Sequence, residues 1–316
     1  MKRPLILLAG PTASGKTKTS VLLAKAIGGE IISADSMQIY KGMDIGTAKI
    51  KPEEMEGVPH YMIDEWSADF PCSVAVFKEK VKAYLDVIYA KGKIPILVGG
   101  TGFYINAILY DTKFDETEAD TTYRQALESL AKEQGALVLH EQLRVVDPES
   151  AKAIHPNNVK RVIRALEYYK DTGTKISEHN AKEKEKRTEN ESPYDYTFFA
   201  LSMDRATLYE RINLRIDQMI EEGLVQEVKQ FFEAGFSEDL PSMKAIGYKE
   251  FFPYFKGEQS LEDCIEKLKQ NTRNYAKRQL TWFRHQADPI FIEVDELSFD
   301  AERITEEMLQ ILKNNI

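Results

Sequence analysis

The residues from Gly10 to Thr17 have the types and spacing that bind phosphate groups. They read Gly-Pro-Thr-Ala-Ser-Gly-Lys-Thr and fit the pattern G-x-x-x-x-G-K-[ST]. A strand-like run, Leu5–Ala9, precedes this loop, and a segment with apolar residues at helical spacing follows it. In such a loop the backbone N–H groups converge on one anion. The predicted diphosphate or polyphosphate contacts are Gly10, Pro11, Thr12, Ala13, Ser14, Gly15, Lys16 and Thr17, with magnesium on the Thr17 hydroxyl.

A second chemical group, Asp35, follows another predicted strand, Glu30–Ala34. An acid at the carboxyl end of a parallel strand lies at the edge where such sheets bind ligands. The alternative is an Asp that only stabilises a turn or caps a helix. The apolar strand Ile94–Val98 ends in Gly-Gly-Thr-Gly and lacks the Asp that P-loop hydrolases use for magnesium and water.

Composition and length are those of a globular protein with two domains, or one large domain with an insertion. The chain has 316 residues, of which 43% are hydrophobic and 29% are charged. No apolar stretch approaches the roughly 20 residues of a membrane span, and a strand begins too early for a signal peptide. Cys72 and Cys264 lie far apart, and the histidines show no ligand spacing. We expect a cytoplasmic protein whose only metal is the magnesium that accompanies phosphate.

Basic residues cluster in two segments although the net charge is −9. The predicted helix Lys267–His285 contains no acidic residue, and its basic residues Arg273 and Lys277 share one face. The second cluster, Lys160–Arg164, follows Asn and Pro residues typical of a helix start. A solvated cationic face is the ordinary interpretation of one such cluster. Two of them on an acidic protein favour a polyanion such as RNA.

Alternating strands and helices in the first hundred residues predict an α/β fold with a parallel sheet and helices on both faces. Residues 113–192 instead show helical periodicity, heavy charge and no convincing strand. We therefore predict a P-loop core formed by residues 1–112 and 193–316, and an inserted all-helical domain at residues 113–192. Within it, Ala181–Ser192 is expected to be a mixed-charge linker or mobile loop. The expected strands are Leu5–Ala9, Glu30–Ala34, Tyr61–Ile63, Ile94–Val98 and Tyr196–Leu201.

Several motifs together resemble those of the bacterial tRNA dimethylallyltransferases, also called tRNA isopentenyltransferases. Tyr61 stands where a second histidine is frequent in that family, and Asn274 where glutamine is frequent; neither change removes a group with an expected chemical role. The motifs occur in the family's order along nearly the whole chain: Gly10–Thr17, Asp35–Tyr40, Lys41–Lys49, Gly57–His60, Gly99–Thr101, Ala245–Glu250 and Ala276–Gln279.

The resemblance implies transfer of a dimethylallyl group from its diphosphate to the exocyclic amino nitrogen of the tRNA adenosine immediately 3′ of the anticodon. The P-loop would hold the diphosphate leaving group, and Arg211 and Arg215 resemble the family's additional diphosphate contacts. Asp35 would be the general base, since a carboxylate of ordinary pKa is ionised at neutral pH. Thr101 would assist substrate positioning or the diphosphate oxygen; a hydrogen bond within its own turn is the alternative.

The resemblance also implies that the target adenosine is extruded from its stack into the core. Gln38 could pair with an adenine edge at the entrance. We expect a monomer without membrane association. The predicted RNA contacts are Asp35, Ser36, Met37, Gln38 and Thr101 at the entrance, Arg124, Lys160, Arg161, Val162, Ile163 and Arg164 on the anticodon stem, and Arg273, Lys277 and Arg278 on the loop side.

Three other functions share part of this pattern. An enzyme that prenylates free adenine nucleotides would share the P-loop and Asp35, although the helical insertion and the two basic clusters argue against it. A P-loop kinase would turn over a nucleoside triphosphate. An RNA-binding protein with a vestigial P-loop fits least, because Lys16, Thr17 and Asp35 are all intact.

Overall fold

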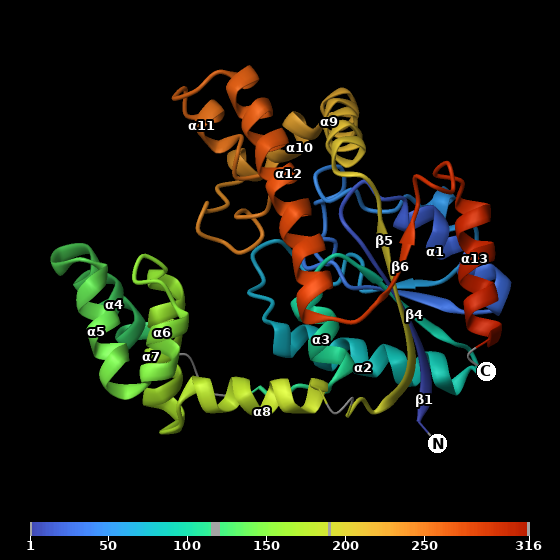
Figure 1. The fold of residues 1–316 in the computed structure, drawn as a ribbon. Coiled ribbons are helices and arrows are strands. Elements are labelled where there is room, and N and C mark those ends of the chain that lie inside the picture. The colour runs from blue at the N-terminus through green and yellow to red at the C-terminus, as the bar shows by residue number, and fades with distance from the viewer. Residues whose placement is uncertain (1, 115–120, 189–190, 315–316) are drawn as a thin grey trace. The chain divides into compact units, whose positions relative to one another are not determined.

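The computed structural model describes residues 2–114, 121–188 and 191–314, and the chain divides into two compact units (Figure 1). The larger unit comprises residues 1–109 and 193–316, and the helical unit comprises residues 110–192. The helical unit therefore begins at Tyr110, slightly before the predicted boundary at residue 113.

The larger unit is built on a six-stranded sheet in which every pair of neighbouring strands is parallel. This confirms the predicted α/β class. The strand order is β3-β2-β4-β1-β5-β6, and β6 is a strand that the sequence pattern did not predict. The strands are β1 (Arg3–Ala9), β2 (Glu30–Ser33), β3 (His60–Tyr61), β4 (Pro95–Gly99), β5 (Tyr194–Ser202) and β6 (Ile290–Glu293).

Helices cover both faces of this sheet (Figure 1). The connection from β1 to β2 and the connection from β3 to β4 run in opposite directions along the sheet. Right-handed crossovers then place α1 and α2 on opposite faces. Helix α13 packs on α1, and α3 packs on α2. The helices of the larger unit are α1 (Lys16–Ile27), η1 (Pro52–Met55), α2 (Val74–Ala90), α3 (Gly102–Leu109), α9 (Arg205–Glu221), α10 (Leu224–Glu233), α11 (Phe252–Phe255), α12 (Leu261–Gln286) and α13 (Ala301–Asn314).

Helix α2 shows how sequence pattern sets these elements. Ser73 caps its start, because the Ser73 side chain accepts a hydrogen bond from the Val76 N–H. Phe77, Val81 and Leu85 recur every four residues and are buried, so one face of the helix packs against the sheet.

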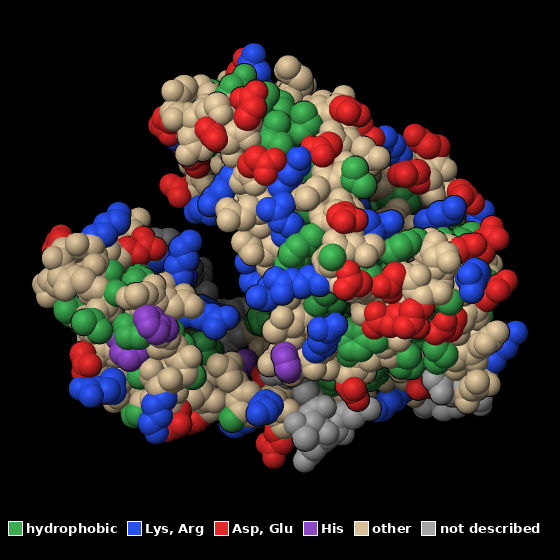
Figure 2. All heavy atoms as spheres, turned by 45° about the horizontal axis from the view of Figure 1, so that its top comes forward, with side chains coloured by type: hydrophobic (Ala, Val, Ile, Leu, Met, Phe, Trp, Pro, Cys, Tyr) green, Lys and Arg blue, Asp and Glu red, His purple; other side chains and the backbone are tan. Residues whose placement is uncertain are grey.

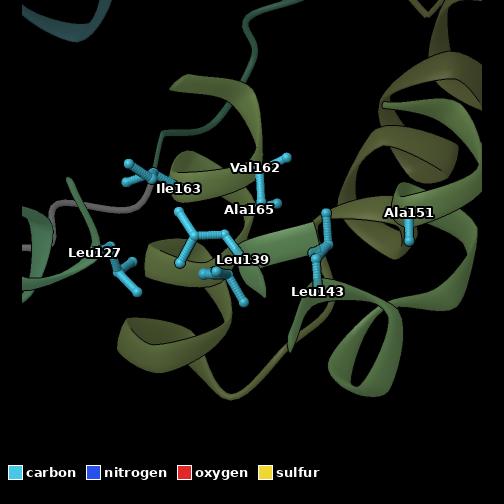
Figure 3. Close-up of a cluster of buried hydrophobic side chains, with 8 residues drawn as sticks. Leu127, Leu139, Leu143, Ala151, Val162, Ile163 and Ala165 are labelled. Atoms are coloured by element: carbon cyan, nitrogen blue, oxygen red, sulfur yellow. The ribbon is translucent and has the colours of Figure 1, made fainter. Parts of the chain in front are cut away.

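The helical unit has its own apolar core (Figure 3). Val162 and Ile163 of α7 pack in this core, where they are 0% and 3% exposed. The prediction that these two residues contact RNA is therefore wrong as far as their side chains are concerned. Helical spacing explains it, because the apolar residues of α7 form the stripe that faces inward. The helices are α4 (Thr121–Gln134), α5 (Ala136–Val146), α6 (Pro148–Ala153), α7 (Val159–Thr172) and α8 (Ile176–Thr188).

The predicted linker Ala181–Ser192 is also corrected. Helix α8 continues to Thr188, so the first part of that segment is helical; residues 189–190 lie outside the described residues. Alanine, lysine and glutamate are strong helix formers, and Glu178 precedes Lys182 by the four residues that favour a charge pair on a helix.

Candidate active site

The predicted chemical groups meet at the carboxyl edge of the sheet. Strands β2, β4 and β1 are neighbours, and they lead into Asp35, Thr101 and the P-loop respectively. The ends of β2 and β4 lie very close, because a Cβ atom on Gly99 would stand 2.4 Å from the Ala34 carbonyl oxygen. Only glycine permits this approach, so Gly99 brings the Asp35 and Thr101 turns together.

Within the P-loop, the lysine is folded back onto the loop itself. Lys16 Nζ donates hydrogen bonds to the carbonyl oxygens of Gly10 at 3.0 Å and Pro11 at 2.6 Å. The Lys16 pKa is lowered to about 7, chiefly by burial and also by the nearby charge of Arg215, while the charge of Asp35 opposes the shift. A bound anion would favour the charged ammonium, so the loop is arranged for a negatively charged ligand.

Two arginines of α9 lie beside this loop, and they differ in whether their guanidinium groups already have a hydrogen-bond partner. Arg211 Nε donates to the Ala13 carbonyl oxygen at 3.0 Å, and its guanidinium lies 4.4 Å from the centre of the Phe299 ring. Arg215 makes no hydrogen bond or ion pair with any residue that the structure describes, and burial lowers its pKa. This guanidinium near Lys16 has no anionic partner among the described residues, so Arg215 is the stronger candidate for the predicted diphosphate contact.

Asp35 both stabilises its own turn and keeps one carboxylate oxygen available for chemistry at the sheet edge, the two roles that the sequence left as alternatives. Its Oδ1 accepts hydrogen bonds from the N–H groups of Met37 at 2.8 Å and Gln38 at 3.4 Å, which is a turn-stabilising role. Its Oδ2 accepts no hydrogen bond from the described part of the chain, so one oxygen is free to receive a proton. The assumption of an ordinary pKa is wrong: burial raises the pKa of Asp35, and the two backbone hydrogen bonds and the charges of Lys16 and Arg215 offset only part of the rise.

Gln38 does not have the free amide that the sequence suggested. Its Oε1 accepts from Ser33 Oγ at 2.9 Å, and its Nε2 donates to the carbonyl oxygens of Thr47 at 3.1 Å and Ala48 at 3.3 Å. The side chain therefore braces the Asp35 turn against the next loop, and the prediction that it pairs with an adenine edge is not supported. Ser36 and Met37 are half-buried and stay predicted contacts.

That next loop is held by one buried carboxylate. Glu227 of α10 accepts hydrogen bonds from the N–H groups of Asp44, Ile45 and Gly46 at 2.7–3.0 Å. Tyr248 donates its hydroxyl to the same carboxylate at 2.5 Å. Glu227 thus connects two of the motifs named above, and it supports the Asp35 turn through the carbonyl groups that Gln38 binds.

Thr101 and two residues of α12 complete the site. The Thr101 hydroxyl is buried and makes no hydrogen bond of ordinary geometry with a described residue, although the Tyr275 hydroxyl is close enough to interact with it. Tyr275 lies beside it, and its pKa rises to about 12, chiefly through burial and also through the charge of Asp35. Gln279 bonds both Gly100 and Thr12. Sequence reasoning assigned no role to Tyr275 or Gln279; the only signal was the motif that contains Gln279.

The basic residues of α12 differ in their availability. Lys277 and Arg278 are exposed, whereas Arg273 is half-buried and donates to Asn213 Oδ1 at 2.7 Å. Helix α12 confirms the predicted helical segment, and Lys277 and Arg278 stay the stronger candidates for phosphate contacts.

Of the four basic residues predicted to hold the anticodon stem, Arg124 has an acidic partner and the other three do not have one among the described residues. Arg124 makes two hydrogen bonds of 2.7 Å with Glu167, so its charge is already neutralised. Lys160, Arg161 and Arg164 are exposed on α7 and form no ion pair with any described residue. Figure 2 shows basic and acidic side chains interspersed over the visible surface of each unit, so these clusters are local features.

Two other kinds of feature are absent from the residues that the structure describes. No helix there has the length and apolar character needed to cross a membrane. No group of three or more His, Cys, Asp or Glu side chains there could hold a metal ion.

Comparison with known proteins agrees with the motifs. The family model of IPP transferase matches residues 38–286. A tRNA dimethylallyltransferase of Lachnoclostridium phytofermentans is 54% identical over 310 residues, covering 98% of this chain and 97% of that protein. A second, from Bacillus cytotoxicus, is 52% identical over 316 residues, covering 99% of this chain and 98% of the relative.

Solved structures show the same likeness. The crystal structure of the full-length tRNA isopentenylpyrophosphate transferase from Bacillus halodurans is similar with a TM-score of 0.72 and 43% identity, covering 100% of this chain and 98% of that one. A eukaryotic dimethylallyltransferase, solved in crystallographic snapshots while acting on tRNA, is similar with a TM-score of 0.77 and 33% identity, covering 94% of this chain and 75% of that one. The sequence and the fold together show that this chain belongs to the IPP transferase family.

Proposed function

We propose that this chain transfers a dimethylallyl group from dimethylallyl diphosphate to the exocyclic amino nitrogen of the adenosine 3′-adjacent to the anticodon of tRNA. One observation carries the proposal: a phosphate-binding loop and a carboxylate with one free oxygen meet at the same sheet edge. Hydrolysis would instead need an acid that activates water at the end of β4, where Gly99 stands.

In this reaction the amino nitrogen bonds to the allylic carbon while the bond from that carbon to the diphosphate oxygen breaks. Lys16, Arg215 and the N–H groups of the P-loop stabilise the negative charge that grows on the diphosphate. Asp35 Oδ2 accepts the proton that the nitrogen loses. The hydroxyl of Thr101, beside Tyr275, hydrogen-bonds to substrate at the same edge.

The residues present fit a magnesium ion that arrives with the diphosphate. Magnesium usually keeps several waters and takes one or two protein ligands besides phosphate oxygens. Thr17 is exposed in the first turn of α1, next to Lys16, and its hydroxyl can be one such ligand. Bound there, magnesium would neutralise part of the diphosphate charge. We also propose that the enzyme acts as a monomer on the anticodon stem-loop in the cytoplasm.

The experiment that tests this function is mass spectrometry of adenosine. Unmodified tRNA is incubated with the protein, magnesium and either dimethylallyl diphosphate or ATP. The expected result is a dimethylallyl adduct on one adenosine of the tRNA when dimethylallyl diphosphate is supplied, and no adduct when ATP is supplied. Transfer to free adenine nucleotides but not to tRNA, or turnover of ATP alone, would replace the proposal by a small-molecule prenyltransferase or a kinase.

The exposed basic residues of α7 give a first prediction. Replacing Lys160, Arg161 and Arg164 together by glutamine should raise the KM for tRNA, because these unpaired cations are free to bind phosphate. The slope of log K against log salt should flatten by roughly 0.7–0.9 for each phosphate that the variant no longer neutralises. Binding titrations at several salt concentrations measure both quantities.

A matched control removes the same charge from the same unit. Arg144, Lys152 and Lys175 are ion-paired with Glu141, Glu149 and Glu178, and their replacement by glutamine should change the tRNA affinity much less. Binding of dimethylallyl diphosphate should be equal in both triple variants and the wild type. Equal salt slopes in the two triple variants would assign the α7 cluster to an ordinary solvated surface.

A further inference from the structure

Gln279 occupies the point at which three segments of the larger unit meet. It lies on α12, is only 6% exposed, and uses both ends of its amide group. Nε2 donates to the Gly100 carbonyl oxygen at 3.0 Å, and Oε1 accepts from the Thr12 N–H at 3.3 Å. The amide therefore joins α12 to the turn after β4 and to the P-loop.

The fit around this amide is close. A Cβ atom on Gly100 would lie 2.1 Å from Gln279 Nε2, so any side chain at residue 100 would displace the amide from its present position. A buried amide that left either partner unsatisfied would be destabilising, and both partners are present here. The next residue after Gly100 is Thr101, whose buried hydroxyl lies at the same edge of the sheet beside Tyr275.

We infer that Gln279 is a positioning residue for the transfer reaction. It fixes the distance between the donor loop and the Thr101 turn, so that the diphosphate and the adenosine meet at the reacting geometry. It also sits on the helix that carries the exposed Lys277 and Arg278, so the RNA-facing helix and the donor loop hold one arrangement. The inference rests on the proposed transfer function.

Two substitutions separate this role from simple packing. Gln279→Met has a similar length but neither donates to Gly100 nor accepts from Thr12. Displacing reacting groups by about 1 Å can cost on the order of 10²-fold in rate, so kcat should fall tenfold to a hundredfold. The affinity for tRNA should change much less than kcat, because the exposed Lys277 and Arg278 remain available to bind phosphate. Gln270→Met, on an exposed position of the same helix, is the matched control and should have wild-type kcat.

Gln279→Glu adds a test that depends on pH. A protonated carboxyl can donate to the Gly100 oxygen and accept from the Thr12 N–H, as the amide does, whereas the ionised form cannot donate. Burial raises the pKa of an introduced carboxyl. The ratio of kcat for Gln279→Glu to wild-type kcat should therefore rise as pH falls and exceed the ratio for Gln279→Met, which should stay constant with pH.

The outcomes are distinct. If Gln279→Met keeps wild-type kcat, or if Gln279→Glu at low pH is no faster than Gln279→Met, Gln279 does not position the loops. If the pH effect came only from repulsion between the new charge and the diphosphate, the two variants would converge at low pH. Thermal unfolding and the number of donor molecules bound per chain keep a folding defect separate from a change in kcat. The wild type is assayed first, because absence of transfer there would refute the proposed function and not the role of Gln279.

Discussion

Replacing Asp35 by asparagine should lower kcat by about 10²- to 10⁴-fold, the range for loss of a general base. Asparagine keeps an oxygen that can accept the Met37 N–H, so the turn should survive while the basic oxygen is lost. Binding of dimethylallyl diphosphate should persist, because neither oxygen of Asp35 is assigned to the diphosphate. Single-turnover assays of prenyl transfer measure the effect.

The value of kcat/KM for the wild type should fall as the pH is lowered, because Asp35 becomes protonated. The carboxylate is the active form and predominates above its pKa. Because burial raises that pKa, the acid limb of kcat/KM should lie at higher pH than for an ordinary Asp. The limb should disappear in Asp35→Asn. Asp195→Asn, at an exposed position at the start of β5 on the opposite edge, is the control. If Asp35→Asn turned over within a few-fold of wild type, Asp35 would only stabilise its turn.

Lys16→Ala should lower kcat by roughly 10²- to 10³-fold as well as weaken donor binding. The negative charge on the diphosphate grows as the carbon–oxygen bond breaks, so the ammonium interacts more strongly with the transition state than with the bound donor. Rapid-quench measurement of the transfer step, with both substrates saturating, isolates kcat from affinity.

Lys18→Ala is the matched control for this substitution. Lys18 is exposed in the same helix and should leave both constants unchanged. Thermal unfolding of Lys16→Ala reports the separate effect of losing the hydrogen bonds to Gly10 and Pro11. A variant in which only the KM for the donor rises would show that Lys16 binds ground state and transition state equally.

The central site could be predicted from the sequence because its groups follow directly from apolar strands. The P-loop, Asp35 and Thr101 each come after such a strand, and the carboxyl ends of neighbouring parallel strands share one edge. The strand order, which places β4 between β2 and β1, could not be predicted, because it depends on contacts between segments and not on the residues of any one segment.

Two of the wrong predictions and one missed contact each have a different physical reason. Val162 and Ile163 belong to the apolar stripe of α7, and their helical spacing was a usable signal for burial. The raised pKa of Asp35 depends on how much water the folded site excludes, which no local pattern encodes. The hydrogen bond from Thr12 to Gln279 joins positions 267 residues apart, so only the packing of α12 reveals it.

The place of the helical unit within the chain also bears on how the protein matures. β1 lies between β4 and β5, and β5 begins at Tyr194, after the whole helical unit. During synthesis, residues 110–192 leave the ribosome before the strand that covers the second edge of β1. The helices of that unit depend on contacts close in sequence and can form early, whereas the sheet must wait for a partner nearly two hundred positions away. Until then the edge of β1 exposes unpaired backbone groups, and a nascent chain paused before β5 is the species most open to aggregation or chaperone binding.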